Sequence, residues 1–311
     1  MKTTCEICFR HCRLDEGQTG FCRARFCSDD AVKPVAYGAL TSLALDPIEK
    51  KPLYHFYPGS YILSAGGFGC NLNCPFCQNA EISLADGRSE IPGTKTLSPE
   101  ELVDICVEYK NAGKLATEYR RGFRSESVKT GMFNEEPDRS DECIGLAFTY
   151  NEPLIHFEYV LDTAKLLREN DLKCVLVTNG SATADTLGKV LPWIDAMNID
   201  LKSFNEDYYR NVLRGDLNTT KEFIEKAAAA CHVEITTLII PGENDSDEEM
   251  DEIASYISDI GNKNNKDIPL HISRFFPRSR YSDRAPTPVK TVYHLAERDR
   301  RQLKYVYEGN W

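Results

Sequence analysis

Three cysteines in the first third of the chain have a spacing typical of metal ligands. Cys70, Cys74 and Cys77 lie in the stretch SYILSAGGFGCNLNCPFCQNA, residues 60–80, with the pattern C-x3-C-x2-C. A structural zinc ion takes four ligands, usually as two pairs, and this trio is unpaired. A four-iron four-sulfur (4Fe-4S) cluster held by three thiolates would keep one iron open for chemistry. The alternative is that the three cysteines are small buried apolar residues.

A second group of cysteines lies at the N-terminus. Cys5, Cys8, Cys12 and Cys22 have the pattern C-x2-C-x3-C-x9-C, and charged residues between them leave little apolar surface for a core. We therefore expect this segment to fold around a metal. Four thiolates suit either a closed zinc site or an auxiliary iron-sulfur cluster, and His11 could replace one of them. The alternative is a set of free thiols on a flexible arm.

The elements that must position the Cys70 loop follow a repeated pattern. A β-rich apolar run, polar residues at its end and a helical stretch recur along the chain, and six strands alternating with helices predict a parallel α/β sheet. We expect a partial (β/α)6 barrel of the TIM type with a small N-terminal cysteine-rich module, its active site at the C-terminal strand ends. The six runs cover residues 61–63, 143–150, 174–178, 196–201, 233–240 and 270–275.

The same patterns divide the chain into three parts. We expect a cysteine-rich module and connector over 1–58, the barrel over 59–280 and a helix with a tail over 281–311. Residues 28–59 read as a short strand and an extended connector packed against the barrel, in which Lys50, Lys51, His55 and Tyr57 either face the active-site mouth or lie in solvent. The polar stretch 115–142 lacks a sustained period and is interpreted as an insertion, either a cover or partner contact or an inert loop.

Local signals place several helices. Ser98, followed by proline and two glutamates, marks a helix start, as does Ser246 with Glu249. Apolar residues then recur at helical spacing after Ser98, so we expect Cys106 to be a core residue. A last helix is predicted over about 289–303.

At the central cysteines the sequence resembles the radical S-adenosylmethionine (SAM) superfamily, with Phe76 in the aromatic place before the last cysteine. The longer run, ALDPIEKKPLYHFYPGS at 44–60 and FGCNLNCPFCQNAEIS at 68–83, resembles the radical SAM enzyme of the AmmeMemoRadiSam system. That group is related to pyruvate formate-lyase activating enzymes. The resemblance implies that Cys70, Cys74 and Cys77 hold a 4Fe-4S cluster and that SAM chelates its fourth iron.

The resemblance also implies an activity. Reductive cleavage of SAM would give methionine and a 5′-deoxyadenosyl radical, which abstracts hydrogen from a protein or small-molecule substrate. A reductant such as flavodoxin or ferredoxin and a protein partner of the Memo or AMMECR type are expected with it.

Polar residues at the strand ends are the candidates for binding SAM. Glu152 follows the second strand, where a carboxylate can accept hydrogen bonds from an ammonium group, and the resemblance assigns this position to the SAM amino group. Thr178 and Asn179 end the third strand and are placed near SAM by the resemblance. Asn79, just after the cysteines, is a further expected contact. The alternatives are a solvated glutamate and a plain strand-to-helix turn.

The fourth and sixth strands carry further candidates. Alternation puts Asn198, Asp200 and Lys202 on one strand face. Buried charges need partners, so Asp200 and Lys202 are expected to pair with each other, with a ligand or with a small cation. The resemblance places both near SAM and substrate and matches His271 to a SAM-contacting histidine. A structural ion pair is the alternative for Asp200 and Lys202.

Composition excludes several classes of protein. A net charge of −11 over 311 residues would repel phosphate backbones, so no nucleic acid is expected as a partner. No apolar run approaches the roughly 20 residues of a membrane span, and the N-terminus lacks the apolar core of a secretion signal. Twelve cysteines then indicate a reducing compartment, and the cytoplasm is expected.

The leading hypothesis is thus a radical SAM enzyme, an oxidoreductase-type enzyme resembling the activating enzymes. One branch installs a glycyl radical on a partner protein, and another modifies a small molecule or peptide. A different class is a zinc-binding interaction protein without catalysis. An electron carrier would need every iron ligated by protein and no SAM.

Overall fold

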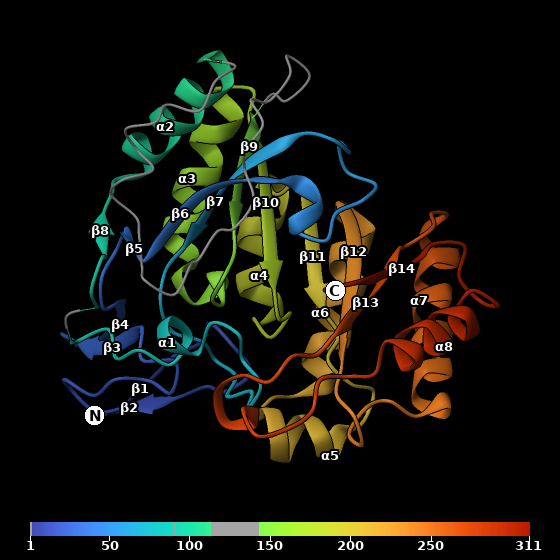
Figure 1. Cartoon of the computed structure of the whole chain (residues 1–311). Coiled ribbons are helices and arrows are strands. Elements are labelled where there is room, and N and C mark those ends of the chain that lie inside the picture. Colours follow the sequence, from blue (N-terminus) through green and yellow to red (C-terminus); the bar gives the residue numbers. More distant parts are fainter. Residues whose placement is uncertain (1, 90, 113–142) are drawn as a thin grey trace.

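The computed structural model describes residues 2–89, 91–112 and 143–311. A single curved sheet, in the order β14-β13-β12-β11-β10-β9-β7-β6, forms the centre of the molecule (Figure 1). Seven of its strands are parallel, and the inner six confirm the six strands expected from the sequence. They are β7 (Tyr61–Gly66), β9 (Cys143–Phe148), β10 (Lys173–Thr178), β11 (Ala196–Asp200), β12 (His232–Ile239) and β13 (Leu270–Arg274).

Two edge strands extend the sheet beyond the expected six. β6 (Ser42–Pro47) pairs antiparallel with β7, and β14 (Val306–Gly309) pairs parallel with β13. The sheet order begins with β14 and ends with β6, so the barrel is partial, as expected. The tail expected after the last helix contains this strand, and residues 306–309 hydrogen-bond to the edge of the sheet.

Helices lie outside the sheet and cover its outer face (Figure 1). The capping box predicted at Ser98 is present: Ser98 N donates to Glu101 Oε2 (2.7 Å) and Glu101 N donates to Ser98 Oγ (3.2 Å). Ser246 Oγ caps the helix after β12 by accepting from Glu249 N (3.2 Å), and Cys106 is fully buried. The main helices are α2 (Pro99–Ala112), α3 (Phe157–Glu169), α4 (Ala184–Val190), α6 (Leu217–Ala230), α7 (Asp247–Asn264) and α8 (Val289–Asp299).

The connector between β6 and β7 enters the barrel instead of lying in solvent. Leu53 packs in an apolar cluster with side chains of β7, β9, β10 and β11. The backbone amides of Tyr54 and His55 donate to the Glu234 carboxylate on β12 at 3.0 and 2.7 Å. The connector therefore packs against the barrel, as expected, and the solvated interpretation is wrong for Lys51, which is buried with its Nζ 2.9 Å from Asp46 Oδ2, whereas His55 and Tyr57 are exposed.

The N-terminal module lies beside the C-terminal ends of the strands, next to α1 (Ala80–Ser83) (Figure 1). Its strands are short, so hydrogen bonding within them accounts for little of its structure. They are β1 (Thr3–Thr4), β2 (Arg13–Leu14), β3 (Arg25–Ser28) and β4 (Ala31–Pro34), followed by β5 (Ala39–Leu40), which pairs with β8 (Lys95–Thr96).

The expected insertion at 115–142 lies outside the described residues. Among those that are described, no helix is long and apolar enough to cross a membrane.

Candidate active site

The central cysteine loop follows β7 and holds three partly buried cysteines. Burial and the neighbouring Cys74 raise the pKa of Cys70, while burial and Cys77 raise the pKa of Cys74, to about 12. Cys77 Sγ lies 3.1 Å from Ser83 Oγ. Thiols that are both buried and close enough to repel as anions need a cation to become thiolates, and an iron-sulfur cluster supplies it. The donor set therefore fits such a cluster.

The thiols are not arranged around one point. Within the described part of the chain, no group of three or more His, Cys, Asp or Glu side chains could hold a metal ion. A four-iron cluster binds each thiolate at a separate iron, so its ligands need not converge on one centre.

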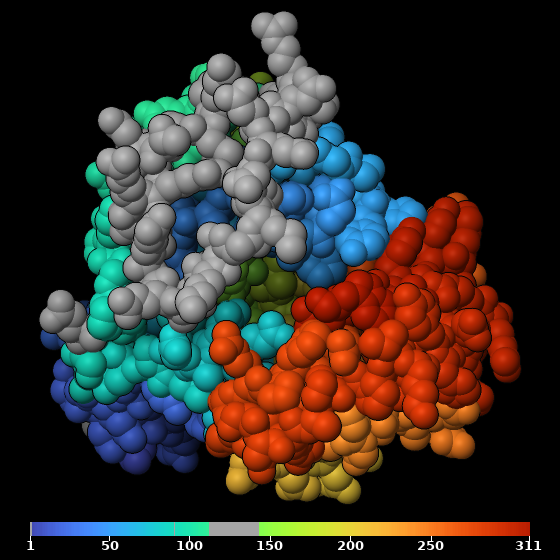
Figure 2. All heavy atoms as spheres, viewed as in Figure 1, coloured from blue at the N-terminus to red at the C-terminus, as the bar shows by residue number. Residues whose placement is uncertain are grey.

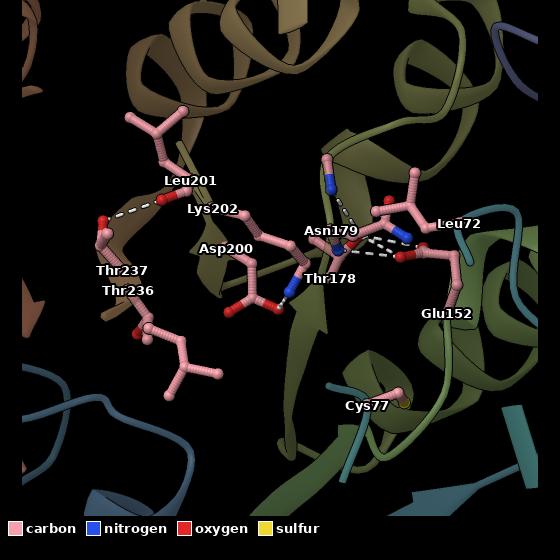
Figure 3. Close-up of polar contacts among 12 residues, drawn as sticks. Leu72, Cys77, Glu152, Thr178, Asn179, Asp200, Leu201, Lys202, Thr236 and Thr237 are labelled. Carbon is pink, nitrogen blue, oxygen red and sulfur yellow. Dashed lines mark hydrogen bonds and ion pairs between the residues drawn. The ribbon is translucent and has the colours of Figure 1, made fainter. Parts of the chain in front are cut away.

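Glu152 joins the ends of β9 and β10. Its Oε1 accepts from Leu154 N (3.0 Å), as a cap of the short 3-10 helix Pro153–His156, and its Oε2 accepts from Asn179 N (2.8 Å). Thr178 Oγ1 lies 2.9 and 3.0 Å from the two carboxylate oxygens (Figure 3). Burial raises the pKa of Glu152 to about 7 against the effect of these hydrogen bonds. Three donors leave room for one more on a carboxylate that has about four lone-pair positions.

Asn179 connects Glu152 with the cysteine loop. Its Nδ2 lies 3.5 Å from Cys70 Sγ and 2.9 Å from Asn71 Oδ1. Asn71 is only 1% exposed, and it was missed in the sequence because an asparagine between cysteines has no distinguishing pattern. The structure thus brings Cys70, Glu152, Thr178 and Asn179 together.

Asp200 and Lys202 form the expected ion pair at the end of β11, with 2.9 Å between Oδ2 and Nζ (Figure 3). Burial lowers the pKa of Lys202, but the neighbouring Asp200 and Cys74 raise it by more, so the net pKa is raised. The ammonium group therefore stays charged near the cysteine loop. A charged pair at a strand end can exchange one partner for a ligand group of the same sign.

The remaining candidates make different contacts. His271 is not brought to the Glu152 group, since its Nε2 lies 2.6 Å from Glu234 Oε2 inside the barrel. Phe76 is buried with its ring centroid 6.1 Å from that of Tyr281, and Asn79 Nδ2 donates to the backbone oxygen of Tyr150 (2.8 Å). Phe76 and Asn79 thereby fix the cysteine loop against its surroundings.

The four N-terminal cysteines are also gathered. Burial raises the pKa of Cys8 to about 12, with Cys22 and Cys5 contributing, and the pKa of Cys22 is raised by burial, by Cys5 and by Cys12. All four are free thiols. The metal site expected from their spacing stays a prediction.

The face that holds the cysteine loop is hollowed. Figure 2 shows a depression between the cyan atoms that follow the cysteine loop and the red atoms of the C-terminal part, with green atoms of the sheet region visible at its base. The strand ends that carry Glu152 and Asn179 belong to the green part of the chain.

The chain is similar in sequence to known proteins. Residues 136–254 match the family model of the radical SAM superfamily. That range includes Glu152, Asn179 and Asp200 but not the cysteine loop. An uncharacterized protein of Methanocaldococcus jannaschii is 36% identical over 313 residues, which cover 99% of this chain and 81% of that protein.

An enzyme sequence and a solved structure are more distantly similar to the chain. Pyruvate formate-lyase 1-activating enzyme of Escherichia coli K12 is 21% identical over 62% of this chain and 67% of the enzyme. The crystal structure of SuiB from Streptococcus suis superposes with a TM-score of 0.53 at 12% identity, over 79% of this chain and 48% of SuiB. This last similarity shows the fold alone, and the chain spans about half the length of SuiB.

Proposed function

The chain belongs to the radical SAM superfamily, and we propose that Cys70, Cys74 and Cys77 bind a 4Fe-4S cluster at which SAM is cleaved reductively. When bound, this cluster would supply the electron that splits SAM into methionine and a 5′-deoxyadenosyl radical, which abstracts hydrogen from a protein or small-molecule substrate. The proposal is carried by one observation: the three cysteines lie on one loop, and Cys70 of that loop contacts Asn179, whose backbone amide donates to Glu152.

Glu152 is proposed to bind the amino group of SAM. Its buried carboxylate has one unfilled acceptor position and lies beside the cysteine loop, and an ammonium group would neutralise its charge. Thr178 and the Asn179 amide fix the carboxylate from the β10 side. Asn179 Nδ2 holds the Cys70 side of the loop.

Asp200 and Lys202 are proposed to contact SAM or the substrate. Their ion pair lies at a strand end next to Cys74, where a ligand carboxylate could bind Lys202 and a ligand ammonium group could bind Asp200. His271 would reach a ligand from inside the barrel with the part of its ring that does not bond Glu234. Phe76 and Asn79 would shape the loop side of the cofactor site.

We also propose a second metal site in the N-terminal module. Cys5, Cys8, Cys12 and Cys22 would hold zinc or an auxiliary iron-sulfur cluster, and because no described group of such side chains is arranged around one ion, the four thiols would have to close around a zinc ion as it binds. The reductant would be of the flavodoxin or ferredoxin type, and the protein partner of the Memo or AMMECR type. Such chemistry fits the cytoplasm.

Two alternatives remain testable. Similarity to pyruvate formate-lyase 1-activating enzyme supports the branch in which a glycyl radical is installed on a partner protein. That branch predicts an electron paramagnetic resonance (EPR) signal on the partner. A zinc-binding interaction protein would instead contain zinc and no iron.

The direct test is anaerobic. The purified chain is reconstituted with iron and sulfide, reduced with dithionite and supplied with SAM. We expect 5′-deoxyadenosine in the product mixture. A fully reconstituted protein that forms none would refute the proposal.

A further inference from the structure

Arg10 lies between the two cysteine groups. Its Nε donates to the backbone oxygen of Asn71 (2.7 Å), the residue after Cys70, and its guanidinium also donates to the backbone oxygen of Arg214. The guanidinium stacks on Phe21, with its carbon 3.3 Å from the ring centroid. Arg10 is thus held by backbone oxygens of the barrel on one side and by an aromatic ring of its own module on the other.

The contact continues into the proposed cofactor site. Asn71 Oδ1 accepts from Asn179 Nδ2 (2.9 Å), and the Asn179 backbone amide donates to Glu152 Oε2 (2.8 Å). Asn179 Nδ2 also lies 3.5 Å from Cys70 Sγ. A continuous set of hydrogen bonds therefore runs from Arg10 to both the first cysteine and the carboxylate proposed to bind SAM.

The positive charge of Arg10 lies near both groups of thiols. Its guanidinium lies within electrostatic range of Cys70 and, in the N-terminal module, of Cys8, Cys12 and Cys22. Arginine keeps its charge under all ordinary conditions. When these thiols are thiolates, Arg10 is a cation near both groups, while Arg25 lies near the N-terminal group alone and Lys202 near Cys74.

The module is also docked next to this contact. Phe9 N donates to Ser181 O (3.4 Å), Thr183 N donates to Ile7 O (3.0 Å) and Thr183 Oγ1 donates to Glu6 O (2.8 Å). Residues 181–183 follow β10 directly, just after Asn179. The position of Arg10 is therefore set by the turn that carries the cofactor-site residues.

We propose that Arg10 is a positioning residue of the active site, which fixes the Cys70 end of the cysteine loop and, by its positive charge, raises the reduction potential of the cluster bound there. The inference rests on the proposed function. Reduction adds negative charge to the cluster, and a nearby cation stabilises the reduced form more than the oxidised form. The N-terminal module then contributes a side chain to the catalytic centre.

The test compares full-length variants after anaerobic reconstitution, at equal iron content. The reduction potential is measured by redox titration of the EPR signal that changes when SAM is added, and SAM affinity is measured alongside. We expect Arg10→Gln to have a more negative midpoint potential and several-fold weaker SAM binding, and Arg10→Lys to restore the potential. Arg13→Gln, which changes an exposed arginine of the same module, is the matched control and should leave both unchanged.

Each outcome decides the inference. A wild-type potential and wild-type SAM affinity in a fully loaded Arg10→Gln protein would overturn it. If Arg10→Gln takes up no iron, the Arg10→Lys variant decides. An Arg10→Lys protein that contains iron and has the wild-type potential supports the role of the charge. An Arg10→Lys protein that also takes up no iron overturns the proposal. A wild-type protein that binds iron and cleaves no SAM overturns the proposed function. The midpoint potentials of wild type and Arg10→Gln can still be compared in that case, and they decide the role of Arg10 separately.

Discussion

Glu152 and Asn179 are joined by a hydrogen bond of 2.8 Å from the Asn179 backbone amide to Oε2. The contact links the ends of two neighbouring parallel strands at the edge where the cysteine loop lies. It therefore fixes the carboxylate by backbone geometry, so that side-chain substitutions at Glu152 leave the donor in place.

Glu152→Gln should weaken SAM binding. The amide keeps the size of the side chain but removes the negative charge, and a charge-assisted hydrogen bond contributes about 1.5–3 kcal/mol. We expect the dissociation constant of SAM to rise by at least about tenfold, measured by anaerobic calorimetry. Glu225→Gln, on the exposed face of α6, is the control. Equal affinity in Glu152→Gln and wild type would contradict the assignment.

SAM affinity should also depend on pH. Burial raises the pKa of Glu152 to about 7, so its carboxyl is mostly neutral at pH 6 and mostly ionised at pH 8. Only the ionised form attracts an ammonium group, and affinity should therefore increase between these values by up to about tenfold. Titrations of wild type and Glu152→Gln across this range check the cause. The variant should show the shallower dependence, and parallel curves would point to another group.

Cys74→Ala should abolish formation of 5′-deoxyadenosine and lower the iron content. The substitution removes one of three thiolates, and no neighbouring side chain of the loop supplies another. Cys106→Ala is a matched control, because Cys106 is a fully buried cysteine of α2 that packs in the core. It should keep iron and activity. Product formation by Cys74→Ala at the wild-type rate would exclude the proposed cluster.

Glu234→Ala should destabilise the fold. Burial opposes ionisation of Glu234, but hydrogen bonds from His232, His271 and the two connector amides lower its pKa to about 2. Its contribution to stability is therefore present above about pH 4.5 and lost as pH falls toward 2. Removing it leaves a buried histidine and two amides without an acceptor, at a cost of about 3 kcal/mol.

Urea unfolding at pH 7 measures this difference. Glu225→Ala, which removes an exposed glutamate, should stay within about 0.5 kcal/mol of wild type. A similarly small effect of Glu234→Ala would mean that the connector is not held by this carboxylate.

Asp299→Asn should stabilise the protein above neutral pH. Asp299 is fully buried at the end of α8, and neither carboxylate oxygen has a hydrogen-bond partner among the described residues. Burial and nearby Asp251 raise its pKa to about 7. The folded chain thus binds more protons than the unfolded chain between about pH 4 and 7, and the free energy of unfolding falls as pH rises through this window.

The Asp299→Asn variant has no carboxyl group at this position, so its free energy of unfolding does not fall in this way as pH rises. We expect its free energy of unfolding to exceed that of wild type by about 1–2 kcal/mol at pH 8, with a smaller difference at pH 5. Asp259→Asn, at an exposed position of α7, is the control. Identical pH profiles for wild type and Asp299→Asn would refute the explanation.

Much of the fold could be predicted from the sequence because each inner strand is a short apolar run with polar residues at its end. β14 could not, since four residues at a sheet edge are ordered by the neighbouring strand and not by their own pattern. The burial of Lys51 was equally hidden, because a lysine reads as exposed unless its partner is known. Asp46, that partner, is supplied by a strand whose pairing with β7 is a tertiary feature.

The site shows the same division. The cysteine trio and Glu152 could be selected from local patterns, and the Asp200–Lys202 pair follows from strand alternation. Arg10 and Asn71 could not be selected, because their contact joins residues 61 positions apart and neither has a chemical pattern of its own. Contacts between modules depend on how the folded parts dock.

The connector held by Glu234 has a consequence for what can react in this protein. Leu53 and the amides of Tyr54 and His55 occupy the N-terminal end of the barrel, so we expect a substrate to approach from the opposite end. The depth available to it ends at the Glu234–His271 pair. We therefore expect that lengthening or shortening the connector changes the depth of the barrel that a substrate can enter.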